Sequence, residues 1–434
     1  MLWRRDLETP ARKTLHALLD AAISVARPDV CLAPHLPAIP PTGRLIVLGA
    51  GKAAAAMAQA AEAHYEGDPG YERLSGMVTT RHGYGLATRR IEVVEAGHPV
   101  PDTAGQRAAE RTLALAGAAT AEDLVLVLLS GGASALWSAP VAGLDFAGKQ
   151  ALTRKLLGSG ARIDEMNTVR KHLSRIKGGR LAVAAHPAEV VTLAISDVPR
   201  DDPATIGSGP TVADPTTLAD ARAILAHYAI DLDPAVARAL GDAANETPKP
   251  GATELDRSRF VLVARPQASL EAAARLAATL GYRPVIIGDA LEGEARELAR
   301  HHASLARESL ARGERVALLS GGEVTVTLRG TGEGGPNQEY ALALAIALEG
   351  AAGIAALAAD TDGTDGGSGR VDDPAGAIVD ATTLARASAC HLDAAKFLDN
   401  NDSTGFFRSV GDLVIKGPTQ TNVNDFRAIL IDPA

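Results

Sequence analysis

Three carboxylates lie close together in Ile354–Gly369, whose sequence is IAALAADTDGTDGGSG. Asp360, Asp362 and Asp365 directly follow a short apolar run and are spaced by Thr and Gly. Carboxylates this close repel one another unless a cation or ordered donors lie between them. Mg²⁺ binds a few carboxylates together with phosphate oxygens. The pattern therefore indicates a site for Mg²⁺ and phosphate. A solvated acidic turn is the alternative, because Asp and Gly are common in turns.

The apolar run before these carboxylates is typical of a buried strand. Open α/β sheets bind ligands beyond the carboxyl ends of their strands. Three further predicted strands end in glycine-containing turns: Arg44–Leu48 before Gly49-Ala50-Gly51-Lys52, Leu124–Leu129 before Ser130-Gly131-Gly132, and Arg315–Leu319 before Ser320-Gly321-Gly322-Glu323. We expect backbone N–H groups of the two SGG turns to surround a phosphate.

Lys52 opens a predicted helix, Ala53–Ala63, where a positive charge opposes the helix dipole. Its position is better explained if Lys52 binds a phosphate, with a solvated lysine as the alternative. The glycines at this turn are too few for the P-loop or for the full dinucleotide-binding pattern. His98, in the turn Gly97–Asp102, is interpreted as a hydrogen-bonded structural residue.

The segment Met166–Arg180 is predicted to be one helix that ends at two glycines. Asn167, Arg170, Ser174 and Lys177 would then share a face, either as solvated surface or as a phosphate site. A further strand, Val190–Ile195, leads to Asp197 and then to a long loop, Arg200–Pro215. Loops of this length in compact domains are often functional.

Composition limits the classes of protein to consider. The chain has 434 residues, 46% hydrophobic and 22% charged, which predicts a globular protein of two or three domains. A net charge of −9 argues against nucleic acid as a partner. Two distant cysteines, Cys31 and Cys390, fit a reducing cytoplasm. We expect no signal peptide and no membrane span, and a homodimer is left open.

Strands and helices alternate on both sides of a polar, Pro/Gly-rich segment, Ala243–Asp256, which is the candidate linker. We therefore expect an α/β protein of two domains, residues 1–245 and 255–434, with mainly parallel sheets flanked by helices. Because each half carries a strand followed by SGG, we expect a site between the two domains.

The turns match a known family in order along the chain. GAGK, GHPVPD, SGGAS, NTVRKHLSRIKGGRLA, SDVP…GSGPT, SGGE, NQE, DTDGTDG and GPTQTNVND occur here as they do in glycerate 2-kinases of the MOFRL-containing type. The resemblance covers nearly the whole chain. It implies a Rossmann-like N-terminal domain, a MOFRL-type C-terminal domain and an active site in the cleft between them. It also implies transfer of the ATP γ-phosphate to the 2-hydroxyl of D-glycerate. Some members of the family carry the name hydroxypyruvate reductase.

The resemblance implies roles for particular residues. The catalytic candidates are Lys52, Asp197, Glu323 and Asp362. Asp360 and Asp362 are the candidate Mg²⁺ ligands, and Asp197 is the leading candidate base. ATP, Mg²⁺ and a small hydroxy acid are the expected ligands. The expected binding residues are Gly51, Ser130, Gly131, Gly132, Arg200, Ser320, Gly321, Gly322, Asn337, Asn422 and Asn424.

Two positions depart from the family pattern. Pro336 stands before Asn337 where the family has Arg, and Arg200 stands where the family has Gly. These changes leave the exact hydroxy acid open, and Arg200 is a candidate to replace the missing anion anchor. An aspartyl-phosphatase is a rival interpretation, because DTDGT resembles a phosphatase nucleophile turn. A sugar-phosphate-binding protein is a second rival, although the chain has no evident basic patch.

Overall fold

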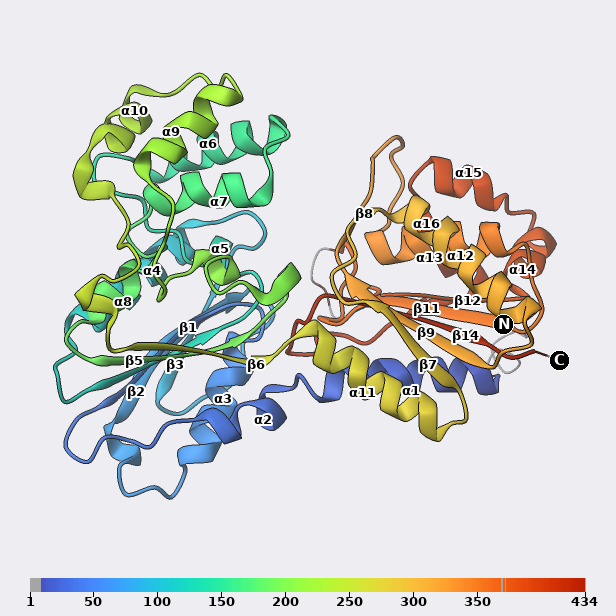
Figure 1. Cartoon of the computed structure of the whole chain (residues 1–434), viewed down its shortest axis with the longest axis horizontal. Coiled ribbons are helices and arrows are strands. Elements are labelled where there is room, and N and C mark those ends of the chain that lie inside the picture. The colour runs from blue at the N-terminus through green and yellow to red at the C-terminus, as the bar shows by residue number, and fades with distance from the viewer. Residues whose placement is uncertain (1–8, 368–369, 371, 434) are drawn as a thin grey trace. The chain divides into compact units, whose positions relative to one another are not determined.

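The computed structural model describes residues 9–367, 370 and 372–433, and the chain divides into two compact units. We call residues 31–263 the N-terminal unit. The C-terminal unit combines the described part of residues 1–30 with that of residues 264–434. Each unit is built on one six-stranded sheet with helices on both faces (Figure 1).

The N-terminal sheet has the strand order β3-β2-β1-β4-β5-β6. Every pair from β3 to β5 is parallel, and this is the order of a doubly wound dinucleotide-type fold. The expected α/β class and Rossmann-like N-terminal part are confirmed. The strands are β1 (Leu45–Ala50), β2 (Leu74–Arg81), β3 (Ile91–Ala96), β4 (Leu124–Leu129), β5 (Glu189–Ile195) and β6 (Ser258–Ala264).

Helices cover this sheet and also form a separate layer. In Figure 1, α3 lies on one face of the sheet while α4 and α8 lie on the other. Four helices, α6, α7, α9 and α10, have an apolar core of their own and form the helical layer of this unit. The helices are α3 (Ala54–Tyr65), α4 (Thr103–Gly117), α5 (Ala133–Leu136), α6 (Phe146–Gly158), α7 (Ile163–His172), α8 (Arg180–Ala185), α9 (Leu218–His227) and α10 (Pro234–Gly241), and α2 (Pro28–Cys31) spans the boundary between the two units.

The C-terminal sheet has the order β13-β12-β11-β14-β9-β7. Only β7 and β9 pair in parallel, and the other neighbours are antiparallel. The expectation of a mainly parallel sheet is therefore wrong for this unit. Its strands are β7 (Arg283–Gly288), β9 (Val316–Gly322), β11 (Ile354–Asp360), β12 (Gly376–Asp380), β13 (Leu413–Val414) and β14 (Asp425–Ile431), and β8 (Gly293–Glu294) pairs with β10 (Val324–Thr325) outside it.

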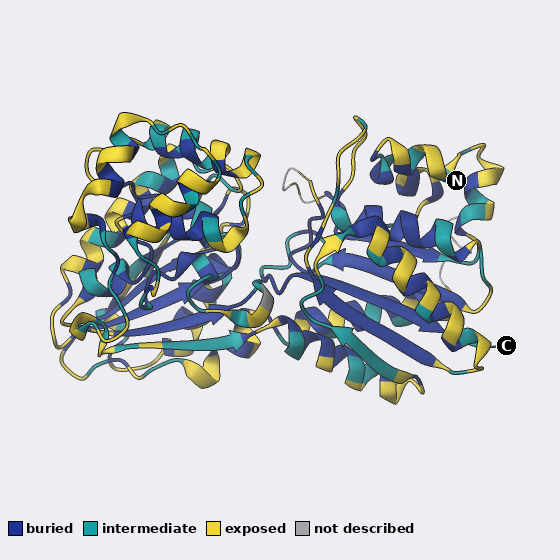
Figure 2. Cartoon of the chain, turned by 45° about the horizontal axis from the view of Figure 1, so that its top comes forward, coloured by how far each residue is buried: buried dark blue, intermediate teal, exposed yellow. Residues whose placement is uncertain are grey.

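Two apolar cores lie on opposite faces of the C-terminal sheet. One packs α1 and α11 against the sheet, and the other packs α12, α13 and the helices that follow. The strands are largely buried and the helices expose only their outer faces (Figure 2). The helices are α1 (Pro10–Ser24), α11 (Pro266–Thr279), α12 (Ala295–Ala311), α13 (Pro336–Leu348), α14 (Thr383–Ala389), α15 (Ala394–Asp399) and α16 (Ser403–Val410).

The boundaries between the units differ from the expected ones. The first helix belongs to the C-terminal unit, where Arg12 pairs with Asp380 at 2.6 Å and with Asp412 at 2.8 Å. The polar segment 243–256 is not a linker, because Asn245 and Thr247 are buried in the N-terminal unit. The chain passes between the units after β6 instead.

The helix expected over Met166–Arg180 is also wrong in its extent. Helix α7 ends at His172, and Ser174 then forms a bridge with Pro140. Gly178 and Gly179 both have positive φ, 58° and 84°, a conformation that a helix does not use. Lys177 therefore lies in a separate segment from Arg170, and the two do not share one helical face.

Candidate active site

The order of strands in the N-terminal sheet reverses between β1 and β4, which lie side by side. Ligands bind at such a switch point, beyond the carboxyl ends of the strands. The chain leaves β1 at Gly51 and leaves β4 at Ser130, so the two predicted turns meet at this point. Ser130 N–H donates to Ala50 O at 3.1 Å, and Lys52 N–H donates to Gly131 O at 2.8 Å.

The turn at Gly51 is closely packed against the turn at Ser130. Gly51 has φ 138°, and a Cβ there would lie 2.1 Å from Ser130 Oγ. The N–H groups from Gly51 to Ala54 are all used within the protein: by Thr79 O, by Gly131 O, by Ser130 Oγ and by Gly51 O, respectively. Because these donors are occupied, the turn from Gly51 to Ala54 offers no N–H group for a phosphate. Lys52 contributes its side chain alone.

The second turn, which follows β4, has two backbone N–H groups that are not used within the described structure. No acceptor among the described residues is recorded for the N–H groups of Gly131 and Gly132. A Cβ at Gly132, whose φ is 86°, would lie 3.5 Å from Lys52 Cγ and 2.9 Å from His98 Nε2. The half-buried side chains of Lys52 and His98 thus pack over this glycine. Two N–H donors beside the side chain of a lysine are well suited to an anion such as phosphate.

Asp197 lies two residues after β5, the neighbour of β4 in the sheet. It is half-buried, in a turn where Val198 N–H donates to Ser196 Oγ at 3.3 Å. Arg200 follows in a short 3₁₀ turn, where it is exposed with φ 67°. This left-handed conformation favours glycine, the residue that the related family has here. The proposed role of Arg200 as an anion anchor stays a prediction.

In the C-terminal unit, three chain ends meet at one edge of the sheet. Strands β9 and β11 both pair antiparallel with β14, so their carboxyl ends lie beside its amino end. Asp360 pairs with Asp425, and Asp425 pairs with Gly322. The acidic turn, the SGG segment and the Asn-rich turn 422–424 are therefore neighbours. These three segments are far apart in the sequence, so the sequence does not reveal that they are neighbours.

Asn337 connects the acidic groups at this edge. Its Nδ2 donates to Asp425 Oδ1 at 2.6 Å and to Asp365 Oδ1 at 3.3 Å. The backbone N–H groups of Asn337 and Gln338, at the start of α13, also donate to the Asp365 carboxylate. Burial raises the pKa of Asp365 to about 6, and these donors partly oppose the shift. Asp365 therefore fixes the amino end of α13 to the acidic turn.

Arg427, which is 1% exposed, lies under the same edge. It is paired with Asp425 and donates to Gly321 O and Gly322 O at 3.4 and 3.3 Å. Burial raises the pKa of Asp425, the Arg427 charge lowers it, and the charge of Asp362 raises it again. Asp425 and Arg427 were missed as members of the site. An arginine inside the apolar strand sequence DFRAILI was the signal that could have identified them.

The candidate metal ligands lie on the acidic turn. Asp362 is buried and Asp360 is half-buried, and Asp362 N–H donates to Asp360 Oδ1 at 2.9 Å. Across the described ranges, no three His, Cys, Asp or Glu side chains are placed to hold a metal ion together. A cation that binds here would complete its shell with substrate oxygens, as Mg²⁺ commonly does.

The remaining predicted binding residues of the C-terminal unit lie in the turn before β14, in β9 or directly after β9. Asn422 and Asn424 use their side-chain oxygens locally, accepting from Asn424 N–H and Asp425 N–H, and so shape the turn before β14. Ser320, Gly321 and Gly322 belong to β9 itself. The expectation of a second SGG turn is therefore wrong, because pairing with β14 continues through Gly322. Glu323 follows as an exposed residue.

Comparison with known proteins identifies two family regions. Residues 14–241 match a family described as a domain of unknown function, DUF4147, and residues 316–425 match the MOFRL family. A protein of Agrobacterium vitis named "Putative hydroxypyruvate reductase" is 50% identical over 99% of this chain and 96% of its own length. The D-glycerate 2-kinase of Thermotoga maritima is 40% identical over 95% of this chain and 97% of its own.

The fold agrees with the sequence comparison. The crystal structure of a glycerate kinase from Thermotoga maritima superposes with a TM-score of 0.85 at 40% identity, covering 97% of this chain and 99% of that one. Within the described residues, no helix is long and apolar enough to cross a membrane. The chain belongs to the glycerate kinase family whose members join a DUF4147 domain to a MOFRL domain.

Proposed function

We propose that the protein transfers the γ-phosphoryl group of ATP to the 2-hydroxyl of D-glycerate, giving 2-phospho-D-glycerate and ADP. The observation that carries the proposal is the switch point of the N-terminal sheet. There Lys52 packs over Gly132, beside two N–H groups without an acceptor in the described structure. Phosphoryl transfer depends on positioning and on neutralising phosphate charge, and this arrangement supplies both.

The proposed roles follow the chemistry of each group. Lys52 and the N–H groups of Gly131 and Gly132 hold phosphate oxygens. Asp197 accepts the proton of the attacking hydroxyl. Glu323 orients the acid. Asp360 and Asp362 would hold Mg²⁺, since neighbouring carboxylates repel one another and the charge of Asp362 raises the pKa of Asp425, which a divalent cation would relieve. When bound, Mg²⁺ would neutralise charge on the phosphates.

The test is an assay of ADP formation with MgATP and a panel of small hydroxy acids, followed by phosphorus NMR of the product. We expect turnover with D-glycerate and a phosphate on the 2-oxygen. A 3-phosphate product would contradict the regiochemistry but retain the kinase. No ADP with any acid would overturn the proposal.

A hydroxypyruvate reductase is the second candidate, because the strand order is that of dinucleotide-binding proteins and a relative carries the name. The contrary observation is that the N–H groups from Gly51 to Ala54 are already occupied. In dinucleotide-binding folds these groups bind the pyrophosphate. Oxidation of NADH or NADPH by hydroxypyruvate, followed by absorbance, distinguishes the two candidates. We expect no oxidation above the rate without enzyme.

A further inference from the structure

Three basic side chains from separate segments of the N-terminal unit form a cluster that no part of the mechanism above uses. They are Lys149 on α6, Arg170 on α7 and Lys177 in the segment before α8, and we call them the basic cluster. Lys149 is 8% exposed and Lys177 is 2% exposed, while Arg170 is half-buried. Their charges act on one another, because Arg170 lowers the pKa values of both lysines. Burial is the largest cause of each of these shifts.

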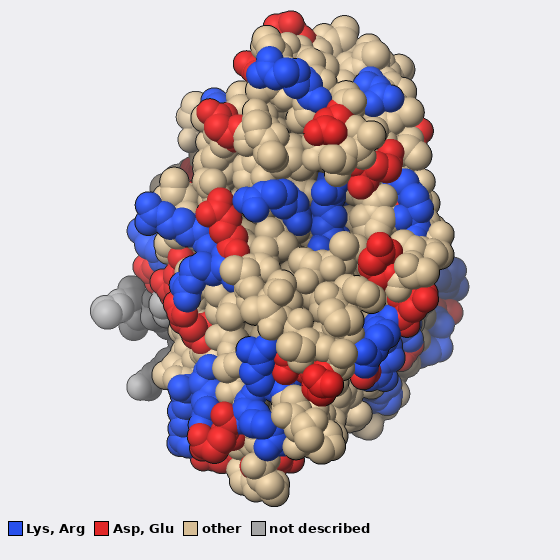
Figure 3. All heavy atoms as spheres, turned by 90° about the vertical axis from the view of Figure 1, so that its left-hand side faces the viewer, with Lys and Arg blue, Asp and Glu red and all other residues tan. Residues whose placement is uncertain are grey.

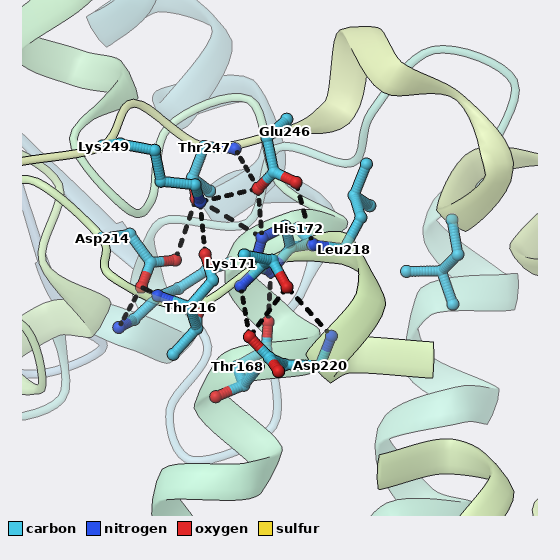
Figure 4. Close-up of polar contacts among 12 residues, drawn as sticks. Thr168, Lys171, His172, Asp214, Thr216, Leu218, Asp220, Glu246, Thr247 and Lys249 are labelled. Carbon is cyan, nitrogen blue, oxygen red and sulfur yellow. Dashed lines mark hydrogen bonds and ion pairs between the residues drawn. The ribbon is translucent and has the colours of Figure 1, made fainter. Parts of the chain in front are cut away.

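The basic cluster lacks the acidic partners that neighbouring basic residues have. Lys171, next to Arg170, pairs with Asp214 at 3.4 Å, and this carboxylate is held in turn by Thr247 (Figure 4). On the face in Figure 3, exposed basic and acidic side chains lie interspersed. By contrast, the Lys149 Nζ atom is buried without a hydrogen-bond partner in the described structure.

A buried ammonium without a partner is unfavourable. Burial, aided by Arg170 and Arg175, lowers the pKa of Lys149 to about 7. An oxyanion placed among these three side chains would supply the missing acceptors and restore the charge on Lys149.

The position of Lys177 connects the basic cluster to the switch point. Lys177 Nζ donates to Ser134 O at 2.7 Å and to Ser134 Oγ at 3.0 Å. Ser134 is two residues beyond Gly132, and its Oγ shares a hydrogen bond of 2.7 Å with Ser208 Oγ of the GSGPT loop. The basic cluster is therefore anchored next to the turn after β4, which carries the N–H groups of Gly131 and Gly132 and over which Lys52 packs.

We propose that Lys149, Arg170 and Lys177 form a second oxyanion site, adjacent to the Lys52 site, that binds a carboxylate or phosphate of a substrate. The inference rests on the proposed kinase function for the identity of the ligand. Two sources share this chemistry, the carboxylate of the hydroxy acid and the phosphates of ATP. The Michaelis constants for D-glycerate and for ATP, measured separately, show which of the two the site binds.

The test uses the full chain with Lys149→Met, and Lys155→Met as the matched control. Lys155 lies on the same helix but is exposed and donates to Asp231 O. We expect Lys149→Met to weaken binding of inorganic phosphate, measured by calorimetry, by about tenfold or more, the loss typical of one charge-assisted hydrogen bond. The Michaelis constant of one substrate should rise in parallel. A rise for D-glycerate identifies the carboxylate as the ligand, and a rise for ATP identifies the phosphates.

Stability provides the readout that separates binding from support of the fold. An apolar replacement of an unpartnered buried ammonium should leave the melting temperature unchanged or raise it. Unchanged phosphate affinity and unchanged Michaelis constants in both Lys149→Met and Arg170→Met would overturn the inference. The inference would also be overturned if Lys149→Met unfolded, because Lys149 would then be needed for the fold. If the wild type binds phosphate through Lys149 but makes no ADP, the proposed function fails while the oxyanion site remains.

Discussion

Lys52 is the residue on which the proposed chemistry depends most directly. It follows Gly51, whose missing side chain lets the two turns of the switch point meet. Its own N–H is bonded to Gly131 O, so the main chain is fixed and the side chain is directed over Gly132. A group held this way needs little rearrangement to act in a transition state.

We predict that Lys52→Met lowers kcat by about 10²-fold or more, the loss typical of removing one group that stabilises transition-state charge. The fold should survive, because the side chain is only half-buried and starts from a turn. Circular dichroism checks the fold and ADP release gives kcat, with Lys155→Met as the control. A kcat within about twofold of the wild type, in a folded variant, would remove Lys52 from the mechanism.

Arg427 and Asp425 form a buried ion pair at the edge of the C-terminal sheet. Removing one partner of a buried ion pair leaves a charge without compensation and costs about 3 kcal/mol or more. We predict that Arg427→Met lowers the free energy of unfolding by about this amount at pH 8, where Asp425 is least able to take up a proton.

The double variant Arg427→Met with Asp425→Asn tests the cause. If the cost comes from the uncompensated carboxylate, the double variant is more stable than Arg427→Met alone in urea titrations. Additive losses would instead mean that Arg427 stabilises mainly through its contacts with the two glycine carbonyls and with the ring of Tyr340.

At the scale of the elements, the packing of α12 against α13 contains a buried histidine. His302 is 1% exposed, and its Nδ1 shares a hydrogen bond of 2.8 Å with the hydroxyl of Tyr340. No partner for Nε2 is recorded in the described structure. Burial, with help from the charge of Arg427, lowers the pKa of His302 from 6.5 to about 4.

The folded protein therefore keeps His302 neutral at pH values where the unfolded chain takes up a proton. Above pH 6.5, His302 is neutral in both states and the lowered pKa costs no stability. As the pH falls from 6.5 to 4, the unfolded chain gains the proton first, and the free energy of unfolding falls by about 3 kcal/mol. We predict that His302→Asn, which keeps a polar atom near Tyr340, flattens the fall in unfolding free energy between pH 6.5 and 4. His301→Asn is the control, because His301 is exposed. Identical pH slopes in the wild type and in His302→Asn would contradict the assignment.

At the scale of the whole molecule, the C-terminal unit is discontinuous in sequence. Helix α1 buries Leu15, Leu18 and Leu19 completely against α11 and the sheet. At about 2 kcal/mol for each leucine, the helix contributes about 6 kcal/mol of apolar burial. This is a large share of the net stability of a typical domain.

We predict that residues 264–434 alone fail to unfold cooperatively, and that a permuted chain in which a flexible linker joins residue 434 to residues 9–30 restores a cooperative thermal transition. Residues 31–263, which have their own sheet and cores, should fold without either. Circular dichroism during heating checks all three chains. A sharp transition in 264–434 at the temperature of the permuted chain would show that α1 is dispensable.

The sequence alone determined the α/β class and buried strands such as β1, β4, β5 and β11, because these depend on local patterns. The run LVLVLL matches β4 residue for residue, and Gly51, Lys52 and Ser130 were identified from their places after strands. The extent of helix α7 was misjudged because the chain leaves the helix after His172 to form a bridge from Ser174 to Pro140, and spacing does not reveal such a contact.

Only the tertiary structure decided which turns meet and which charges are compensated. The antiparallel position of β14 between β9 and β11 brings Asp425 beside both Asp360 and Gly322. It also makes SGG at 320 part of a strand, whereas SGG at 130 is an open turn. Whether a lysine is solvated, paired or buried without a partner depends on what other segments place around it. Lys171 and Lys149 differ in this respect for that reason, since pairing and desolvation are properties of the folded neighbourhood and not of the residue itself.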